Sequence, residues 1–279
     1  MAKDSDAETT TPQPLAARLA PPAARDGLLG SVRTAARVLR AFSGGDGVMG
    51  VSEVARKLDI STSTAHRVLA TLAAERLLEH DATTGKYRPG LALYELGANV
   101  TEHVDLHAAC LPVLTTLRHR TGEMVHVAVL DNLEVVYVER LESHQMLPVF
   151  RRVGHRLPAH LTSSGKVLLA ALPPAELDRR LGGGTLVAWT RRSITDPDRL
   201  RADLAAVRNR GWASNVEEGQ PGITSVGAPI HGADGATMAA VSVVAASQRL
   251  RGNVLQQTVG QLIEAAAVIS VRLGHRPAR

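Results

Sequence analysis

Residues 51–88 constrain the fold most, because they read as two short helices followed by a hairpin. Apolar residues recur at helical spacing in two segments, 51–58 and 65–72. Ser52 and Ser61 stand near the two helix starts, where a hydroxyl can accept a hydrogen bond from a free backbone N–H. We therefore expect Ser52 and Ser61 to be the N-caps of a helix-turn-helix.

A hairpin is expected directly after the second helix. Residues 77–79 and 86–88 flank the loop Asp-Ala-Thr-Thr-Gly, in which Gly85 supplies backbone freedom. A helix pair followed by such a hairpin is typical of a winged helix-turn-helix, which lays its second helix in the major groove of DNA. An ordinary amphipathic helix pair with a solvated polar face is the alternative interpretation.

The polar face of the second helix carries residue types that suit DNA. Hydroxyls, an arginine and a histidine near a helix N-terminus can reach base edges and phosphates, and the helix N-terminus itself attracts phosphate. Basic side chains in the hairpin would add contacts with phosphates. The predicted DNA-contacting residues are Ser61, Thr62, Ser63, Thr64, His66, Arg67, Thr71, Lys86 and Arg88.

Length and composition set the wider limits. At 279 residues the chain has room for about two domains, and a net charge of +5 permits nucleic-acid binding. The single cysteine, Cys110, excludes a disulfide within the chain and is expected to be a packed core thiol. No uninterrupted apolar run is long enough to span a bilayer, and the first residues lack the apolar core of a signal peptide. We expect a soluble, cytoplasmic protein.

The chain divides into four predicted segments. Residues 1–26 are rich in Ala, Thr and Pro and are predicted to be a disordered tail. The winged helix-turn-helix is expected over 27–90, with a further helix over 31–42 that completes its core. A linker helix is predicted over 91–104, and a second domain over 105–275.

Strand and helix patterns alternate in the second domain. A helix over 105–119 is followed at Met124 by a period of two, which predicts a hairpin with strands near 125–129 and 135–141. His126 in the first of these strands is expected to be half buried. Strands are also predicted over 146–153, 212–215, 223–230 and 237–246, and helices over 167–172, 196–210 and 253–273. Hairpins with helices between them indicate an α+β domain.

The sequence Thr-Ser-Ser-Gly at 162–165 leads into the apolar helix expected over 167–172. Small hydroxyl residues at a helix start are suited to hold an anion, and a simple capped helix is the alternative. The leading glycine of a nucleotide P-loop is absent. No metal or cofactor is predicted, because His144, His155 and His160 lack the spacing of a zinc motif.

Six segments, in order, resemble the IclR family of bacterial transcriptional regulators over residues 29–273. They are SEVARKLDISTSTAHRVLATL, VHVAVLDNLEVVYVERLES, VGHRLPAHLTSSGKVLLAAL, TDPDRLRADLAAVRNRGWA, EEGQPGITSVGAPI and DGATMAAVSVV. The resemblance implies an N-terminal winged helix-turn-helix, a linker helix and a C-terminal GAF-like effector-binding domain with an antiparallel sheet. It also implies a homodimer, often paired into a homotetramer on DNA, and a small organic acid or aromatic metabolite as effector.

The resemblance also carries the effector pocket onto Thr162, Ser163, Ser164, Gly165, Asn215, Ser225 and Ser242. Some positions depart from the family's pattern. Asn215 stands where Asp is common, and Ser225 where Cys is common. Val244 and Ala245 stand where a second Ser or Gly pair is common. These departures make the pocket less polar and less acidic, which favours a larger or more apolar carboxylic acid over a small keto-acid.

Together these observations predict a DNA-binding regulator, expected to be a repressor, in which a bound acid alters binding to a roughly palindromic operator. One alternative is a C-terminal domain that has lost its ligand and serves only for assembly. Another is a hydrolase with Ser163 or Ser164 as nucleophile and His155 or His160 as base. The G-x-S-x-G elbow is missing, and a base so close along one loop is hard to orient. No catalytic residue is therefore predicted.

Overall fold

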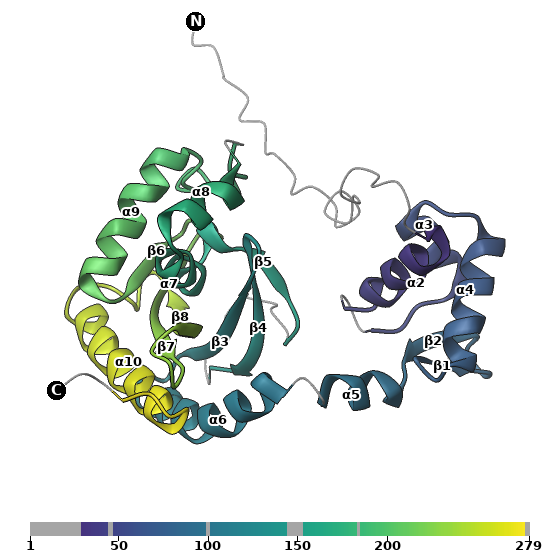
Figure 1. Ribbon diagram of the computed structural model, residues 1–279, viewed down its shortest axis with the longest axis horizontal. Helices are drawn as coiled ribbons and strands as arrows, with labels where there is room; N and C mark the ends of the chain where they lie inside the picture. Colours follow the sequence, from purple (N-terminus) through teal and green to yellow (C-terminus); the bar gives the residue numbers. More distant parts are fainter. Residues whose placement is uncertain (1–28, 44–46, 99–100, 144–152, 183–184, 277–279) are drawn as a thin grey trace, which may run out of the picture. The chain divides into compact units, whose positions relative to one another are not determined.

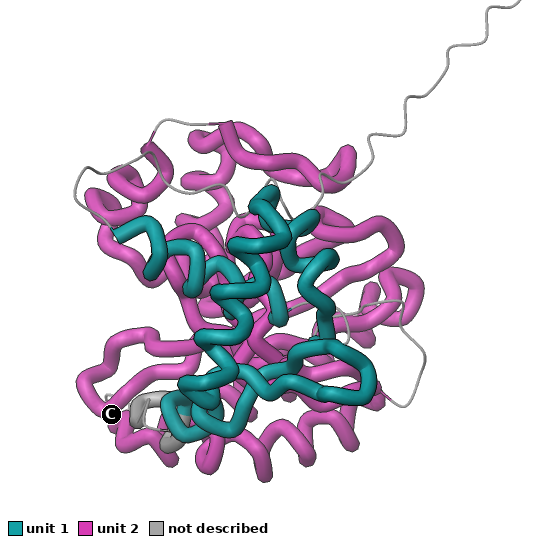
Figure 2. Tube along the Cα trace, turned by 90° about the vertical axis from the view of Figure 1, so that its right-hand side faces the viewer, with its two compact units in different colours: residues 1–99 teal, residues 100–279 magenta. Residues whose placement is uncertain are grey.

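The computed structural model describes residues 29–43, 47–98, 101–143, 153–182 and 185–276. Figure 1 shows its helices and strands, and Figure 2 colours its two compact units, residues 1–99 and 100–279. The tail predicted over 1–26 lies outside the described residues. So does the strand predicted over 146–153, except for its last residue, which is in a turn.

The N-terminal unit contains helices followed by a hairpin, as predicted. Its first elements are α2 (Gly30–Ala41), α3 (Val51–Leu58), α4 (Thr62–Ala74), β1 (Leu78–Asp81) and β2 (Lys86–Pro89). The two strands pair antiparallel. Met49 joins them through two backbone hydrogen bonds with Tyr87, of 3.0 and 2.9 Å, which tie the segment before α3 to the hairpin.

The turn between α3 and α4 has the expected cap. The Ser61 hydroxyl accepts a backbone N–H of the first turn of α4 at 3.2 Å, and Asp59 has a φ of +53°, in the left-handed region. The other cap prediction was wrong. α3 begins after Gly50, whose N–H donates to Glu53 Oε2 at 2.8 Å, and Ser52 is exposed within the first turn.

Apolar side chains from α2, α3, α4 and the hairpin meet in one core. The buried members are Val38, Ala41, Phe42, Met49, Val54, Ala55, Leu58, Ala65, Leu69, Leu72, Leu78 and Tyr87. Each helix contributes the residues of one face at helical spacing. The opposite face of α4 is therefore left to solvent.

The linker differs from its predicted bounds. α5 (Leu91–Ala98) ends earlier than expected, and the next helix, α6 (Thr101–Thr121), already includes residues 101–104. The prediction of one helix over 91–104 was therefore wrong at its C-terminal end. Gly97 near the end of α5 has a low helix propensity, which favours a helix that stops there.

The C-terminal unit is built on a six-stranded antiparallel sheet with the strand order β5-β4-β3-β8-β7-β6. Its strands are β3 (Met124–Asp131), β4 (Glu134–Leu141), β5 (Arg156–Pro158), β6 (Ala213–Val216), β7 (Ile223–His231) and β8 (Thr237–Ala246). The predicted hairpins are confirmed as β3–β4 and β7–β8. The edge strands β5 and β6 have three and four residues.

Helices cover both faces of this sheet (Figure 1). α6 and α10 (Gly252–Arg272) pack on one face; η1 (Ala159–Leu161), α7 (Ser163–Ala171), α8 (Pro174–Leu181) and α9 (Pro197–Arg210) lie on the other. Because both faces are covered, the central strands are apolar nearly throughout. The expectation that His126 is half buried was wrong for this reason: its exposed fraction is 0%.

Cys110 of α6 is a buried core thiol, as predicted, and burial raises its pKa to about 12.

α10 is long and apolar enough, by length and composition alone, to cross a membrane. Its buried residues, such as Leu262 and Ile269, pack in the core with α6 and the sheet, as those of a core helix do.

Some elements were not predicted. One is α8, whose first residue is Pro174, a position where the missing N–H is tolerated. β5 is too short to show a periodicity. α7 begins at Ser163, so residues 162–165 form its cap and first turn rather than a preceding loop.

Candidate nucleic-acid interface and effector site

α4 presents to solvent most of the residues selected from the sequence. Ala65, Leu69 and Leu72 anchor one face of the helix in the core. The exposed residues of the other face include Thr62, Ser63, His66, Arg67 and Thr71. A recognition helix needs this arrangement, because only an anchored helix with a free polar face can enter a groove.

Several hydroxyls of α4 also bond within the helix. Ser61 Oγ donates to Thr64 Oγ1 at 2.8 Å and lies 3.0 Å from Ser63 Oγ. Thr71 Oγ1 donates to the carbonyl oxygen of Arg67 at 2.8 Å. Ser61, Thr64 and Thr71 therefore serve the helix itself, in addition to any contact with DNA.

The basic side chains of the N-terminal unit fall into two groups. Arg37 donates to the carbonyl oxygen of Leu58 at 2.8 Å, and Lys57 Nζ donates to that of Ala41 at 2.7 Å. These two cations hold α2 and α3 together, a role that spacing alone did not indicate. Arg67, by contrast, has no hydrogen bond or ion pair of its side chain with any residue that the structure describes.

The tip of the hairpin is ordered by Asp81. Its carboxylate accepts from Thr84 Oγ1 at 2.9 Å and from the Thr83 N–H at 2.8 Å. These hydrogen bonds, with that of the Thr84 hydroxyl the strongest, lower the pKa of Asp81. Gly85 follows with a φ of +67°, which L side chains rarely adopt. The predicted turn residue is therefore confirmed.

The two basic residues of the hairpin differ in their surroundings. Arg88 lies opposite Glu79 in the strand register, and its Nε donates to Glu79 Oε2 at 2.8 Å. Lys86 is exposed and is not paired with any described residue. A phosphate would therefore share Arg88 with Glu79, whereas Lys86 offers its full charge.

In the C-terminal unit, the start of α7 packs tightly on β7. Thr162 caps α7 by accepting the Gly165 N–H at 2.9 Å. Ser163 Oγ donates to Ser225 Oγ on β7, at 2.9 Å. Gly227 permits this approach, because a Cβ there would lie 2.8 Å from the carbonyl carbon of Ser163. Thr162, Ser163 and Ser225 are all buried.

Strand register brings the other selected residues to the same face. Asn215 lies beside Ser225 on the neighbouring strand. In the next row, Ser242 lies between Gly227 and His126. Residues that are up to about 80 positions apart in the sequence are thus gathered beneath the first turn of α7.

Apolar and aromatic groups border these hydroxyls. Met124, Ile223 and Val244 form a small buried cluster of their own, and Val244 is the cross-strand neighbour of Ser225. The His126 ring packs on Tyr137 with 4.7 Å between ring centroids. The site therefore combines hydroxyls with apolar walls, as small-molecule sites commonly do.

Asn215 and Ser164 have different surroundings. The Asn215 amide donates to the carbonyl oxygen of Leu161 and accepts the Glu218 N–H at 3.1 Å, so its side chain connects η1 with the loop after β6. Ser164 Oγ is buried without a hydrogen-bond partner among the residues that the structure describes. A buried hydroxyl of this kind needs a partner such as water or a ligand.

Two groups of the hydrolase alternative, Ser163 and His160, are engaged elsewhere. Ser163 Oγ is bonded to Ser225, and His160 Nε2 lies 2.9 Å from the carbonyl oxygen of Val187. Burial is the main cause that lowers the pKa of His160. Neither contact is part of a nucleophile–base pair of the kind that activates a serine.

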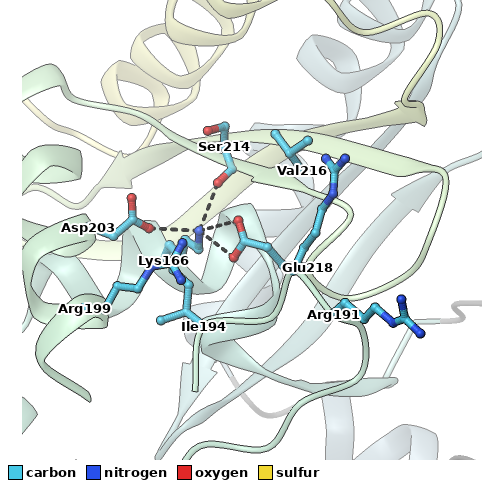
Figure 3. A pocket seen from close by; sticks show the side chains of 9 residues that line it. Lys166, Arg191, Ile194, Arg199, Asp203, Ser214, Val216 and Glu218 are labelled. Carbon is cyan, nitrogen blue, oxygen red and sulfur yellow. Dashed lines mark hydrogen bonds and ion pairs between the residues drawn. The ribbon is translucent and has the colours of Figure 1, made fainter. Parts of the chain in front are cut away.

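A polar pocket that the sequence did not indicate lies beside this site (Figure 3). Lys166 of α7 is 2% exposed, and its Nζ lies 2.7 Å from Glu218 and 2.9 Å from Asp203. Burial raises the pKa of Glu218, while the charge of Lys166 opposes this shift. Lys166 and Glu218 are 52 positions apart, so only the fold brings them together. None of the seven residues selected as an effector site lines this pocket.

Two family models match the chain. The model described as bacterial transcriptional regulator IclR C-terminal matches residues 98–271. The IclR helix-turn-helix domain matches residues 31–82. The helix-turn-helix match lies within the N-terminal unit, and the other match covers most of the C-terminal unit.

Relatives match over most of the chain. HTH-type transcriptional regulator XynR of Escherichia coli (strain K12) is 31% identical over 89% of this chain and 98% of its own length. The glycerol operon regulatory protein of Streptomyces coelicolor is 34% identical over 88% of this chain and 96% of its own. The solved structure of an IclR homologue from Microbacterium hydrocarbonoxydans, complexed with 4-hydroxybenzoate, is 30% identical with a TM-score of 0.78 and covers 87% of this chain and 98% of that one.

Proposed function

The chain belongs to the IclR family of bacterial transcriptional regulators, and we propose that it is a cytoplasmic repressor whose operator binding responds to a carboxylic acid. The observation that supports DNA recognition best is the exposed polar face of α4, opposite its anchored stripe. Thr62, Ser63, His66 and Arg67 reach base edges or phosphates in this proposal. The hairpin adds phosphate contacts through Lys86 and Arg88.

The test of DNA recognition is an Arg67→Ala variant, measured on the operator and on random DNA at one salt concentration. An arginine that reads a guanine contributes about 1–3 kcal/mol of discrimination. We therefore expect a larger loss of affinity for the operator than for random DNA. Arg40→Ala, which removes an exposed charge from α2, is the matched control. An equal loss on both DNAs would reduce Arg67 to a phosphate contact.

We place the effector beneath the first turn of α7. The supporting observations are the buried Ser164 hydroxyl without a described partner, the Ser163–Ser225 pair and the helix N-terminus above them. The IclR homologue from Microbacterium hydrocarbonoxydans was solved in complex with 4-hydroxybenzoate. Val244 and its apolar neighbours favour an aromatic or otherwise apolar acid here as well.

Calorimetry on the full chain tests the effector, with aromatic acids and short keto-acids as titrants. We expect an aromatic acid to bind, and Ser164→Ala to weaken that binding about tenfold, since one hydrogen bond to a charged group is removed. Thr116→Ala, an exposed hydroxyl on the other face of the sheet, is the control. Binding of short keto-acids alone would contradict the proposed ligand class. Operator binding with no response to any acid would favour an assembly-only domain.

We also propose that the protein acts as a homodimer or homotetramer. A roughly palindromic operator needs two DNA-binding domains that are related by two-fold symmetry, one for each half-site. Light scattering on the protein alone and on its operator complex measures the number of chains. A single chain on the operator would contradict this part of the proposal, and a reporter gene that rises when the protein is deleted would support repression.

A further inference from the structure

The pocket around Lys166 is separate from the hydroxyl site and has its own chemistry. It encloses about 460 Å³, within the range of small-molecule sites. It lies among α7, α9, β6 and the segments around residues 191–194 and 218. Its lining residues are Lys166, Arg191, Arg192, Ile194, Arg199, Asp203, Ser214, Val216 and Glu218.

The inner end of the pocket is a buried ion-pair network. Lys166 Nζ contacts the carboxylates of Glu218 and Asp203 and donates to the backbone carbonyl of Ser214 at 3.2 Å (Figure 3). One buried cation thus faces two carboxylates. The network ties three segments together, because α7, α9 and the loop after β6 each supply one of the three charged side chains.

The rim of the pocket is cationic. Arg191 and Arg199 are exposed, and neither side chain forms a hydrogen bond or ion pair with any residue that the structure describes. Among the residues that the structure describes, the Arg192 side chain has only a distant ion-pair contact, 3.9 Å from Glu217. Four cations and two carboxylates line the pocket, so its lining carries a formal charge of +2.

The segment that carries two of these arginines is held in place. Thr190 Oγ1 donates to the carbonyl oxygen of Glu217 at 2.8 Å, and Ser193 Oγ donates to that of Glu218 at 2.7 Å. Ser193 Oγ also accepts the Thr190 N–H at 3.0 Å. Arg191 and Arg192 therefore extend from a turn that is fixed to the pocket wall, which lowers the entropic cost of binding.

We propose that this pocket binds a small oxyanion with two negative charges, a dicarboxylate or a phosphate monoester. Guanidinium groups recognise carboxylate and phosphate through paired N–H donors, and two charges match the excess of the lining. Arg191 and Arg199 provide the main contacts from the rim, while Lys166 offsets one of the two carboxylate charges at the inner end. The site is thus additional to the effector site proposed above.

The test is calorimetry on the full chain with inorganic phosphate, succinate and acetate at constant ionic strength. We expect phosphate or succinate to bind, and acetate to bind at least about tenfold more weakly because it has one charge. The double variant Arg191→Gln/Arg199→Gln should lose that binding. Arg120→Gln, which removes one charge on α6 across the sheet, should retain it.

Each result bears on the proposal directly. A preference for phosphate over succinate would assign the site to phosphorylated ligands, and the reverse preference to dicarboxylates. Equal binding of acetate, no binding of either dianion, or unchanged binding in the double variant would overturn the proposal. Ser164→Ala should leave dianion binding unchanged, so failure here is distinguishable from failure of the effector proposal. Both arginines are exposed, so the double variant is expected to fold.

Discussion

Gly165 allows the first turn of α7 to touch η1. A Cβ at this position would lie 2.1 Å from the carbonyl oxygen of Ala159, a backbone atom that cannot move aside cheaply. We expect Gly165→Ala to lower the free energy of unfolding of the C-terminal unit by about 1–3 kcal/mol or more, as overpacking does. Urea unfolding followed by tryptophan fluorescence measures this, because both tryptophans, Trp189 and Trp212, lie in that unit.

Gly260 provides the matched control. It lies within α10, and a Cβ there would meet no heavy atom within 4 Å. Alanine has a higher helix propensity than glycine, so Gly260→Ala should be neutral or stabilise by up to about 1 kcal/mol. If the two variants have equal stability, the close approach of α7 to η1 is not a constraint on this fold.

His160 should make stability depend on pH. Burial is the main cause that lowers its pKa, with the charge of Lys166 acting in the same direction and the hydrogen bond to Val187 opposing it. The unfolded chain then binds the proton more readily than the folded chain. The stabilising contribution is therefore complete above the unfolded pKa of about 6.5 and is lost as the pH falls through the folded pKa.

Unfolding measured between pH 5 and pH 7.5 tests this for wild type and His160→Gln. We expect the stability of the wild type to fall more steeply with acidification than that of the variant. Burial also lowers the pKa of His231 and raises the pKa of Glu218. Both residues are present in the wild type and in the variant. Their contributions cancel in the comparison, so parallel pH profiles would contradict the assignment to His160.

At the scale of single elements, α3 and α4, the two helices of the helix-turn-helix, differ in how they begin. The Ser61 hydroxyl caps α4, whereas Ser52 lies exposed within α3. We expect Ser61→Ala to destabilise the N-terminal unit by about 1 kcal/mol, and Ser52→Ala to be neutral or slightly stabilising. Thermal unfolding followed by circular dichroism compares the two. A larger loss for Ser52→Ala would reassign the start of α3.

The basic side chains of the β1–β2 hairpin should contribute to the salt dependence of DNA binding. Each phosphate contact contributes about 0.9 to the slope of log affinity against log salt concentration. Lys86→Ala should remove about that much, while Arg88→Ala should remove less because Glu79 shares the Arg88 guanidinium. Glu79→Gln should strengthen binding. If Arg88→Ala and Lys86→Ala have the same effect, the Arg88–Glu79 pair does not persist on DNA.

Elements were predictable from the sequence where a local pattern determines them. The cap at Ser61, the turn at Gly85 and the β7–β8 hairpin each follow from a few adjacent residues. The burial of His126 was not predictable, because it depends on α7 covering a face that an antiparallel sheet can leave to solvent. The helix that starts at Pro174 was missed, since proline indicates helix starts and stops alike.

The candidate sites were likewise not predictable where they depend on contacts between segments that are distant in the sequence. The resemblance selected residues such as Ser163 and Ser225, which the fold brings to 2.9 Å. It did not indicate that the Asn215 amide is engaged with the carbonyl oxygen of Leu161, nor that Lys166 pairs with Glu218. Both contacts join segments that are distant in the sequence, and their existence depends on side-chain packing rather than on any local pattern.

At the scale of the whole molecule, the proposed function requires that effector and operator change each other's binding by the same factor. If the bound acid weakens operator binding by some factor, the operator weakens binding of the acid by the same factor. Calorimetric titration of the acid into free protein and into the operator complex, beside operator titrations with and without the acid, measures both factors. We expect them to agree within error. Unequal factors would require a further equilibrium, such as a change in the number of chains.

The short edge strands have a consequence for solubility. β5 and β6 terminate the sheet with three and four residues, so each offers few free backbone groups to a strand from another molecule. Long, flat edges are the usual templates for β-aggregation, and natural sheets avoid it by keeping their edges short. Concentrated solutions of this protein should therefore resist fibril formation even though its central strands are almost wholly apolar.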